Sequence, residues 1–229
     1  METIGRFNRT DKEADESVME NRIIAVINQK GGSGKTTLAL NLSAGLSLRG
    51  SVHLVDADPQ RSITQWVAMG KNVSGLPAVT QLGRDPEIVL RTLAARNSFV
   101  VVDCPPNVQS EAVAAVMRAA HLVLIPVLPS PIDLWASVDM AVTVHQARQH
   151  NPELRACLVL NQLESRNALS HDMREAVAEF DVPVLAAGMQ RRAAYRSAAV
   201  EGRSVYGMGK RGQMAVSDIE AIIKEVLCL

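Results

Sequence analysis

A glycine-rich turn between a predicted strand and a predicted helix constrains the fold of this chain more than any other feature. The apolar run 23–28 reads IIAVIN, the turn 30–35 reads KGGSGK, and a helical pattern follows over 36–50. This strand–loop–helix order is the context that a phosphate-binding loop requires. Glycines let successive backbone N–H groups and the helix N-terminus surround a phosphate chain. The sequence therefore predicts a nucleotide site at this turn.

The residues of the turn have separate predicted roles. Lys35 would reach the β- and γ-phosphates, and the hydroxyl of Thr36 would bind Mg²⁺. The turn departs from the ordinary pattern G-x-x-x-x-G-K-[ST], because Gln29 occupies the place of the first glycine. A second lysine, Lys30, precedes the glycines instead. The predicted nucleotide-binding residues of the turn are Gly31, Gly32, Ser33, Gly34, Lys35, Thr36 and Thr37, and the purpose of Lys30 is open at this point.

Short apolar runs alternate with helical patterns along the rest of the chain. The runs are continuously apolar, as parallel strands covered on both faces are, and they lie at 23–28, 52–56, 99–103, 121–127, 156–161 and 182–187. A shorter run at 77–82 is a candidate edge strand. Apolar residues recur at helical spacing over 36–50, 86–96, 110–120, 134–149 and 172–180, and a further helix is expected over 220–229. This alternation predicts an α/β fold, a doubly wound, mostly parallel sheet with helices on both faces, as in P-loop NTPases.

Acidic residues stand where two of these strands end. Asp56 and Asp103 each end a predicted strand, and Asp58 follows the first of them. Ligands bind at the carboxyl ends of the strands in such sheets, so these carboxylates could hold a Mg²⁺-bound water or orient the water that attacks the γ-phosphate. An alternative for one of Asp56 and Asp58 is to cap a helix that begins near Pro59 and Gln60. Asp103 ends a buried strand, a costly place for a carboxylate without such a role.

Composition narrows the class of protein. The chain of 229 residues suits one domain, predicted at 21–229, with 1–20 as a disordered polar tail. Hydrophobic residues make up 47% and the net charge is zero, so the chain has an ordinary globular balance and no global attraction to nucleic acid. No stretch approaches the roughly 18 consecutive apolar residues of a membrane span. Cys104, Cys157 and Cys228 lie far apart and suggest no disulfide framework, so we expect a cytoplasmic protein.

Four motifs in order make the chain resemble the ParA/MinD family of deviant-Walker-A ATPases, most of all the short ParA proteins of the ParF type. The motifs are KGGSGKTT, VDADPQRS, VVVDCPP and IPVLPSPIDLWA, and the similarity extends over about residues 22–228. The resemblance implies that Lys30 crosses a nucleotide-sandwich homodimer and touches the phosphates held by the other subunit. It also implies catalytic roles for Lys30, Lys35 and Asp58. The resemblance further implies a metal site of Thr36, Asp56 and Asp103, and an adenine contact by Asn161.

Positive charge gathers in the C-terminal part of the sequence. Only Glu201 opposes the predicted DNA-binding residues, which are Arg191, Arg192, Arg196, Arg203, Lys210 and Arg211. Such a patch can bind a phosphate backbone without reading bases, and the alternative is an ordinary solvated face. The resemblance implies non-specific binding of the ATP-bound dimer to double-stranded DNA, and hence association with the nucleoid. The last predicted helix is acidic, which opposes binding to anionic membranes.

The resemblance implies a positioning ATPase that uses ATP and Mg²⁺ and is released from DNA when a ParB-like or cargo-adaptor protein stimulates hydrolysis. The cargo would be a plasmid or a chromosome, or else a protein body such as a carboxysome or a chemoreceptor cluster. A switch that stays dimeric on DNA needs only weak basal ATPase activity. An alternative of another class is an enzyme that activates a small molecule, similar to dethiobiotin synthetases, but the sequence shows no extra cluster of polar residues to bind the substrate. The cysteines do not fit an iron–sulfur carrier.

Overall fold

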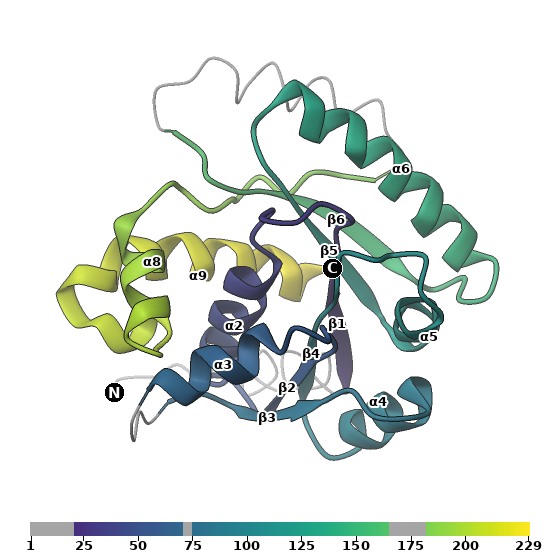
Figure 1. Cartoon of the computed structure of the whole chain (residues 1–229), viewed down its shortest axis with the longest axis horizontal. Coiled ribbons are helices and arrows are strands. Elements are labelled where there is room, and N and C mark those ends of the chain that lie inside the picture. The colour runs from purple at the N-terminus through teal and green to yellow at the C-terminus, as the bar shows by residue number, and fades with distance from the viewer. Residues whose placement is uncertain (1–20, 71–74, 165–181) are drawn as a thin grey trace, which may run out of the picture.

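The computed structural model describes residues 21–70, 75–164 and 182–229. Among the described elements, strands and helices alternate along the chain from β1 to β6, and three helices follow, as Figure 1 shows. The described elements are β1 (Arg22–Val26), α2 (Lys35–Leu46), β2 (Val52–Asp56), α3 (Ser62–Met69), β3 (Ala78–Gln81), α4 (Pro86–Ala94), β4 (Phe99–Asp103), α5 (Glu111–Ala119), β5 (Leu122–Val127), α6 (Pro131–Arg148), β6 (Arg155–Leu160), α8 (Ala193–Val200), the 3₁₀ helix η1 (Val205–Gly212) and α9 (Gln213–Cys228).

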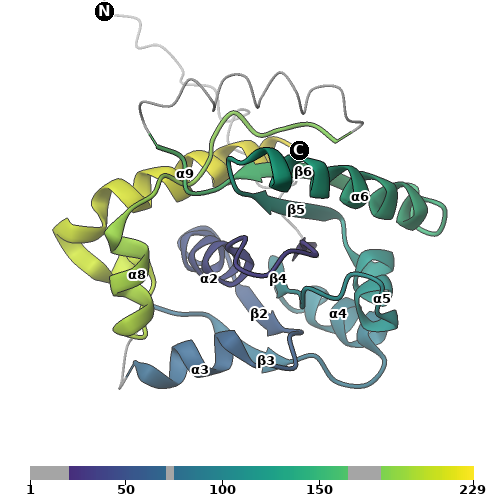
Figure 2. The same cartoon turned by 45° about the horizontal axis from the view of Figure 1, so that its top comes forward.

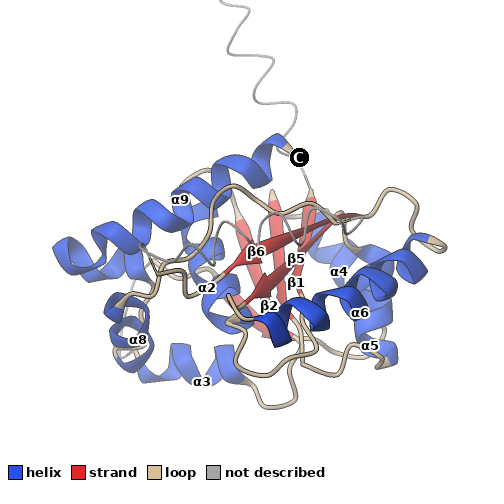
Figure 3. Cartoon of the chain, turned by 90° about the horizontal axis from the view of Figure 1, so that it is seen from above, coloured by secondary structure: helices blue, strands red, loops and turns tan. Residues whose placement is uncertain are grey.

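The strands form one six-stranded sheet in the order β3-β2-β4-β1-β5-β6, and every pair is parallel. Helices α2, α8 and α9 cover one face, and α4, α5 and α6 cover the other (Figures 1 and 2). Figure 3 shows the strands between these two groups of helices. The predicted doubly wound α/β fold is thereby confirmed. The register pairs Asp103 with both Val26 and Asp56, so three strands end side by side.

Two apolar cores explain why the strands are hydrophobic without interruption. Ile24 and Val26 of β1 belong to the core beneath α2 and α9, while Ile23 and Ala25 belong to the core beneath α4, α5 and α6. Successive side chains of a strand point to opposite faces, so a strand buried on both faces must be apolar at every position. The carboxyl ends of the strands are therefore the natural place for polar groups.

The predicted edge strand at 77–82 is confirmed as β3, and the last helix as α9. The strand predicted at 182–187 is wrong, because only Val184 forms an isolated bridge, to Leu158 of β6. Its pairing ends early for two reasons. Pro183 has no N–H to donate, and the N–H groups of Ala186 and Ala187 point instead to the carboxylate of Glu225 on α9. The helix predicted at 172–180 and the polar tail at 1–20 lie outside the described residues.

One helix boundary and two helices also differ from the prediction. The helix expected near Pro59 and Gln60 begins later, at Ser62, because residues 58–61 form a tight turn. In this turn the N–H of Arg61 donates to the carbonyl of Asp58, and Arg61 has φ 56°. The helices α8 and η1 were not predicted as separate elements. Among the described helices, none is long and apolar enough to span a membrane.

Candidate nucleotide site

The turn between β1 and α2 has the shape of a phosphate-binding loop. The amide of Asn28 donates to the carbonyl of Pro126 at 2.7 Å and its oxygen accepts the N–H of Lys30 at 2.9 Å, which fixes the start of the loop. At the end of the loop Gly34 has φ 98°, and a Cβ there would lie 2.1 Å from the side-chain nitrogen of Asn161. Only glycine fits such a position. The loop therefore continues directly into the N-terminus of α2, so the backbone N–H groups of the loop and of the first helical turn follow one another.

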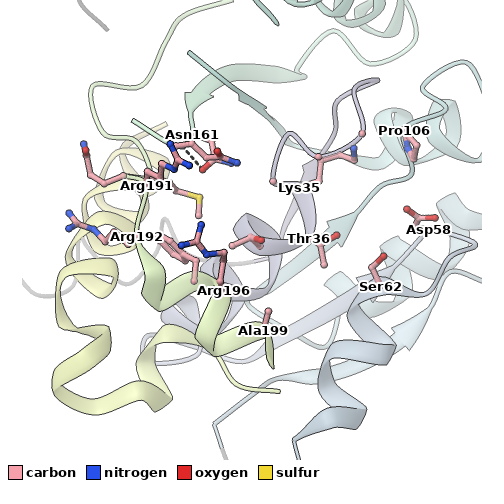
Figure 4. A pocket seen from close by; sticks show the side chains of 18 residues that line it. Lys35, Thr36, Asp58, Ser62, Pro106, Asn161, Arg191, Arg192, Arg196 and Ala199 are labelled. Carbon is pink, nitrogen blue, oxygen red and sulfur yellow. Dashed lines mark hydrogen bonds between the residues drawn. The ribbon is translucent and has the colours of Figure 1, made fainter. Parts of the chain in front are cut away.

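A pocket of about 480 Å³ opens above this loop. Figure 4 shows Lys35 and Thr36 between two sides, with Asp58, Ser62 and Pro106 on one side and Asn161 with three arginines on the other. The residues that line the pocket are Gly31, Gly32, Gly34, Lys35, Thr36, Thr37, Asp58, Ser62, Pro106, Asn161, Gln162, Met189, Gln190, Arg191, Arg192, Tyr195, Arg196 and Ala199. Four cations and one carboxylate among them make the lining of the pocket positive, which favours an anionic ligand. We call the segment 189–199 the C-terminal wall.

The two lysines of the loop lie in different places. Lys35 is buried, and its Nζ donates to the backbone carbonyl of Lys30 at 3.0 Å. Burial lowers the pKa of Lys35, while the negative charges of Asp103 and Asp58 oppose that shift. Lys30 does not line the pocket. Its Nζ pairs with Asp133 in the first turn of α6 at 2.6 Å, and the side chain of Lys30 is 38% exposed.

Asp103 lies beneath the loop in a position that fits a divalent cation. It is 1% exposed, and its Oδ2 accepts the hydroxyl of Thr36 at 2.8 Å. Its Oδ1 is buried without a hydrogen-bond partner among the described residues. Burial raises the pKa of Asp103 to about 7, against the lowering effect of the Thr36 hydroxyl. A buried carboxylate oxygen without a partner is costly, and a hard cation or its bound water would satisfy it.

The other two acids differ in how they are used. Asp56 is buried, and it accepts the N–H and the hydroxyl of Thr64 at 3.0 and 2.8 Å and the N–H of Asp58 at 3.3 Å. Through these bonds Asp56 fixes the start of α3. Its participation in a metal site stays a prediction. Asp58 lines the pocket and accepts the N–H of Gln60 at 2.8 Å. Of these three acids, Asp58 is the one that lines the pocket.

Asn161 follows β6 and supports the phosphate loop. Its side-chain N–H donates to the carbonyl of Ser33 at 2.7 Å, and its oxygen accepts the N–H of Gln162. Both residues of the Asn161–Gln162 pair line the pocket, beyond the phosphate loop. The predicted adenine contact of Asn161 is compatible with this place, although the amide also supports the loop.

The six basic residues predicted to bind DNA form two groups. Arg191, Arg192 and Arg196 belong to the C-terminal wall and line the pocket. A second group lies on or beside η1 and consists of Arg203, Lys210 and Arg211. Within this second group, Glu201 pairs with Arg211 at 3.1 Å and with Arg203 at 3.9 Å. We call Arg203, Lys210 and Arg211 the η1 cluster.

Several residues of the site were not assigned from the sequence. Asn28 orders the loop, Asp133 holds Lys30, and Thr64 holds Asp56. Asp133 stands inside the motif IPVLPSPIDLWA, which marked the family without indicating a contact to the loop. Met189, Gln190 and Tyr195 line the pocket, but no local pattern in the sequence distinguishes them.

The cysteines have no part in the site. Cys104 and Cys157 are free and buried, and burial raises the pKa of both thiols, that of Cys157 to about 11. Across 21–70, 75–164 and 182–229, no group of three or more His, Cys, Asp or Glu side chains could hold a metal ion. Cys104 therefore acts as a small apolar residue at the end of β4, and the described part of the chain offers no cluster for iron and sulfur.

Comparison with protein families identifies the family of this chain. The profile of the CobQ/CobB/MinD/ParA nucleotide binding domain family matches residues 24–205, and the chain belongs to this family. That family's nucleotide-binding character agrees with the loop, the pocket and the buried carboxylate described above. The resemblance predicted from the four motifs is thus confirmed.

Two relatives carry the same name. The chain is 45% identical over 206 residues to the maintenance of carboxysome distribution protein A of Halothiobacillus neapolitanus. The alignment covers 89% of this chain and 95% of the relative. The chain is 34% identical over 209 residues to the protein of that name from Gloeobacter kilaueensis, covering 90% and 94%. Among solved structures, cobyrinic acid a,c-diamide synthase from Mycobacterium smegmatis with bound ADP and magnesium superposes with a TM-score of 0.66 at 22% identity, over 89% of this chain and 94% of that chain. That last likeness shows the fold alone.

Proposed function

We propose that residues 21–229 act as one ATPase that positions a protein cargo of the carboxysome kind on nucleoid DNA. The cycle has four steps: ATP and Mg²⁺ bind, two chains dimerise, the dimer binds double-stranded DNA non-specifically, and a cargo adaptor stimulates hydrolysis. The 45% identity to a carboxysome-distribution protein favours a protein cargo over a plasmid or a chromosome. The likeness to a cobyrinic acid synthase, at 22% identity, supports no small-molecule activation.

The residues of the pocket supply the chemistry of ATP hydrolysis. The loop amides and Lys35 would bind the phosphates, and Asp58 would orient the attacking water. Thr36 and Asp103 would hold Mg²⁺, which neutralises phosphate charge when bound. Weak basal turnover is expected, since the cycle needs a long-lived ATP state.

The place of Lys30 carries the proposal. Lys30 lies outside the pocket of its own chain, paired with Asp133, and is partly exposed. Lys30 would have to leave Asp133 to serve either nucleotide, and we propose that in a face-to-face dimer it reaches the phosphates held by the partner. A cation delivered in this way stabilises charge on the transferring phosphoryl group. This explains why the loop has two lysines.

The η1 cluster is the surface that we propose for DNA. Arg203, Lys210 and Arg211 lie apart from the pocket, so a bound nucleotide leaves them accessible. In a dimer each subunit would contribute one such cluster, and two clusters neutralise more phosphates than one. Binding should therefore require ATP and weaken with salt.

The test pairs two substitutions and measures the dimer by light scattering with ATP and with ADP. Lys30→Ala should bind ATP within about threefold of the unchanged protein, because Lys35 and the loop amides remain, but should stay monomeric. Asp58→Ala should bind ATP and accumulate as the dimer, because hydrolysis no longer releases it. An ATP-dependent dimer in Lys30→Ala would refute the role of that lysine.

DNA binding is tested on random-sequence duplex with ATP, with ADP and without nucleotide, at two salt concentrations. Salt-sensitive binding that requires ATP supports the cycle, and Lys210→Ala should weaken it without changing the affinity for ATP. Absence of binding under every condition would refute the DNA step and leave a protein scaffold as the track.

A further inference from the structure

The C-terminal wall of the pocket is held from two sides, by backbone hydrogen bonds of Met189 and Arg191 to Leu160 and Leu163 and by carboxylates on one face of α9. Segment 182–192 contains no regular strand or helix, so most of its backbone groups need partners from elsewhere. Glu225 of α9 accepts the N–H groups of Ala186 and Ala187 at 2.8 and 2.5 Å. Asp218, about two helical turns earlier on the same helix, receives the other end of the segment.

Asp218 contacts three residues that line the pocket. It accepts the N–H of Gln190 at 3.2 Å and the hydroxyl of Tyr195 at 3.3 Å. The guanidinium of Arg192 donates two hydrogen bonds to it, at 2.6 Å from Nε and 2.8 Å from Nη2. The side chain of Asp218 is 9% exposed and does not itself line the pocket.

This arrangement is strong and directional. A two-point bond between guanidinium and carboxylate fixes both the distance and the plane of the arginine. The pair is largely shielded from water, with Arg192 at 24% exposure, so removing one partner would leave the other charge without compensation. Tyr195 also donates to the carbonyl of Ala215 at 3.2 Å, which ties the wall to the first turn of α9 a second time.

We propose that Asp218 is a positioning residue for the nucleotide. It acts through Gln190, Arg192 and Tyr195, which it holds at the side of the pocket away from Asp58 and Ser62, as Figure 4 shows for Arg192. The phosphate loop occupies the middle of the pocket, so the C-terminal wall contacts the nucleoside part of the ligand. The inference rests on nucleotide binding and needs neither the DNA step nor the cargo.

The same helix offers a matched control. Glu220 is also a carboxylate of α9, and it is bonded to Arg49 at 2.5 Å and to the hydroxyl of Tyr206 at 2.6 Å. Neither Arg49 nor Tyr206 lines the pocket. Glu220→Gln therefore breaks an ion pair of similar kind on α9 without loosening the C-terminal wall.

The experiment measures ADP affinity by calorimetry, the KM and kcat of ATP hydrolysis, and the melting temperature for both variants and the unchanged protein. Asp218→Asn should weaken ADP binding about tenfold and raise KM by a similar factor, because Gln190, Arg192 and Tyr195 lose the carboxylate that orients them, with kcat within about twofold. Glu220→Gln should lower the melting temperature comparably and leave KM unchanged. Asp218→Glu, which keeps the charge, should recover part of the affinity.

Inorganic pyrophosphate serves as the probe for the phosphate loop alone. Its binding should be equal in the unchanged protein and in Asp218→Asn, because the loop is not held by Asp218. An unchanged ADP affinity in Asp218→Asn, or an equal loss in Glu220→Gln, would overturn the assignment. Failure of the unchanged protein to bind ADP would instead refute the nucleotide site itself.

Discussion

The two ends of the nucleotide pocket are built in opposite ways. The phosphate end consists of neighbouring residues on one loop, held by glycine conformations and by short hydrogen bonds such as that from Lys30 N to Asn28. The C-terminal wall consists of the end of an irregular segment and most of α8, and its contacts come from residues distant in sequence, namely Leu160, Leu163 and the carboxylate of Asp218 on α9. A loop whose conformation requires its own glycines leaves a local pattern in the sequence. A wall ordered from outside depends on the whole fold.

The largest expected effect tests the phosphate end. Lys35→Ala should weaken ATP binding by more than about 100-fold, because a buried cation directed at the phosphates contributes several charge-assisted hydrogen bonds. Calorimetry with ATP and Mg²⁺ measures the loss. Lys224→Ala, an exposed lysine on α9, is the control and should bind normally. Equal binding by the two variants would break the comparison, because the wall would then supply the affinity.

A substitution beneath the loop separates metal binding from folding. Asp103→Asn should make ATP binding at least about tenfold less responsive to Mg²⁺, since an amide is a poorer ligand for a hard cation than a carboxylate. The fold should not suffer, because the amide oxygen can still accept the hydroxyl of Thr36. Titration of Mg²⁺ at fixed ATP measures the first effect, and undiminished Mg²⁺ dependence would rule out Asp103 as part of the metal site.

The stability of Asp103→Asn relative to the unchanged protein should change with pH in one direction. Burial raises the pKa of Asp103 from 3.8 to about 7, so the ligand-free folded state holds a proton that the unfolded state releases. This stabilisation is present below pH 4 and is lost as the pH rises toward 7. Asp103→Asn has no such loss, so its melting temperature relative to the unchanged protein should rise between pH 5 and pH 8. A constant difference across that range would contradict an ionising Asp103.

The smallest expected effect sharpens the role of the wall. Arg196 lines the pocket and was predicted from the sequence to bind DNA. Arg196→Ala should weaken ADP binding about threefold to tenfold, the effect of losing one partly solvated charged contact. Its DNA binding at saturating ATP should remain close to normal, and Lys210→Ala should show the reverse. If Arg196→Ala lost DNA binding and kept its ADP affinity, Arg196 would belong to the DNA-binding surface of the protein and not to the nucleotide pocket.

The contrast between the two ends also explains what the sequence could reveal. Glycines at Gly32 and Gly34 adopt φ of 76° and 98°, a local requirement that leaves a local pattern. Strand-end acids such as Asp103 are visible because a charged residue ends an apolar run. The pairing of Lys30 with Asp133, by contrast, joins residues on separate elements, and neither of the two motifs in which they stand indicates a contact with the other.

The run VPVLAA illustrates the same limit. Its composition is that of a strand, and it lies beside β6, but Glu225 takes two of the N–H groups that a strand would use. The carboxylate that decides the matter is distant in sequence and belongs to a helix whose acidity was interpreted only in relation to membranes. Competition of this kind, between a local preference and a distant partner, does not show in local patterns.

The pocket depends on contacts that close very large loops of chain. The bond from Asn161 to Ser33 joins residues 128 positions apart, and that from Val205 N to Asn41 joins residues 164 positions apart. The complete pocket exists only when these contacts have formed, and closing such large loops costs conformational entropy. ATP can therefore bind only a chain that has completed its fold, and its binding energy is added to the native state and to no earlier species. In a cell, bound nucleotide would therefore protect fully folded molecules from proteolysis but would not assist the folding of nascent chains.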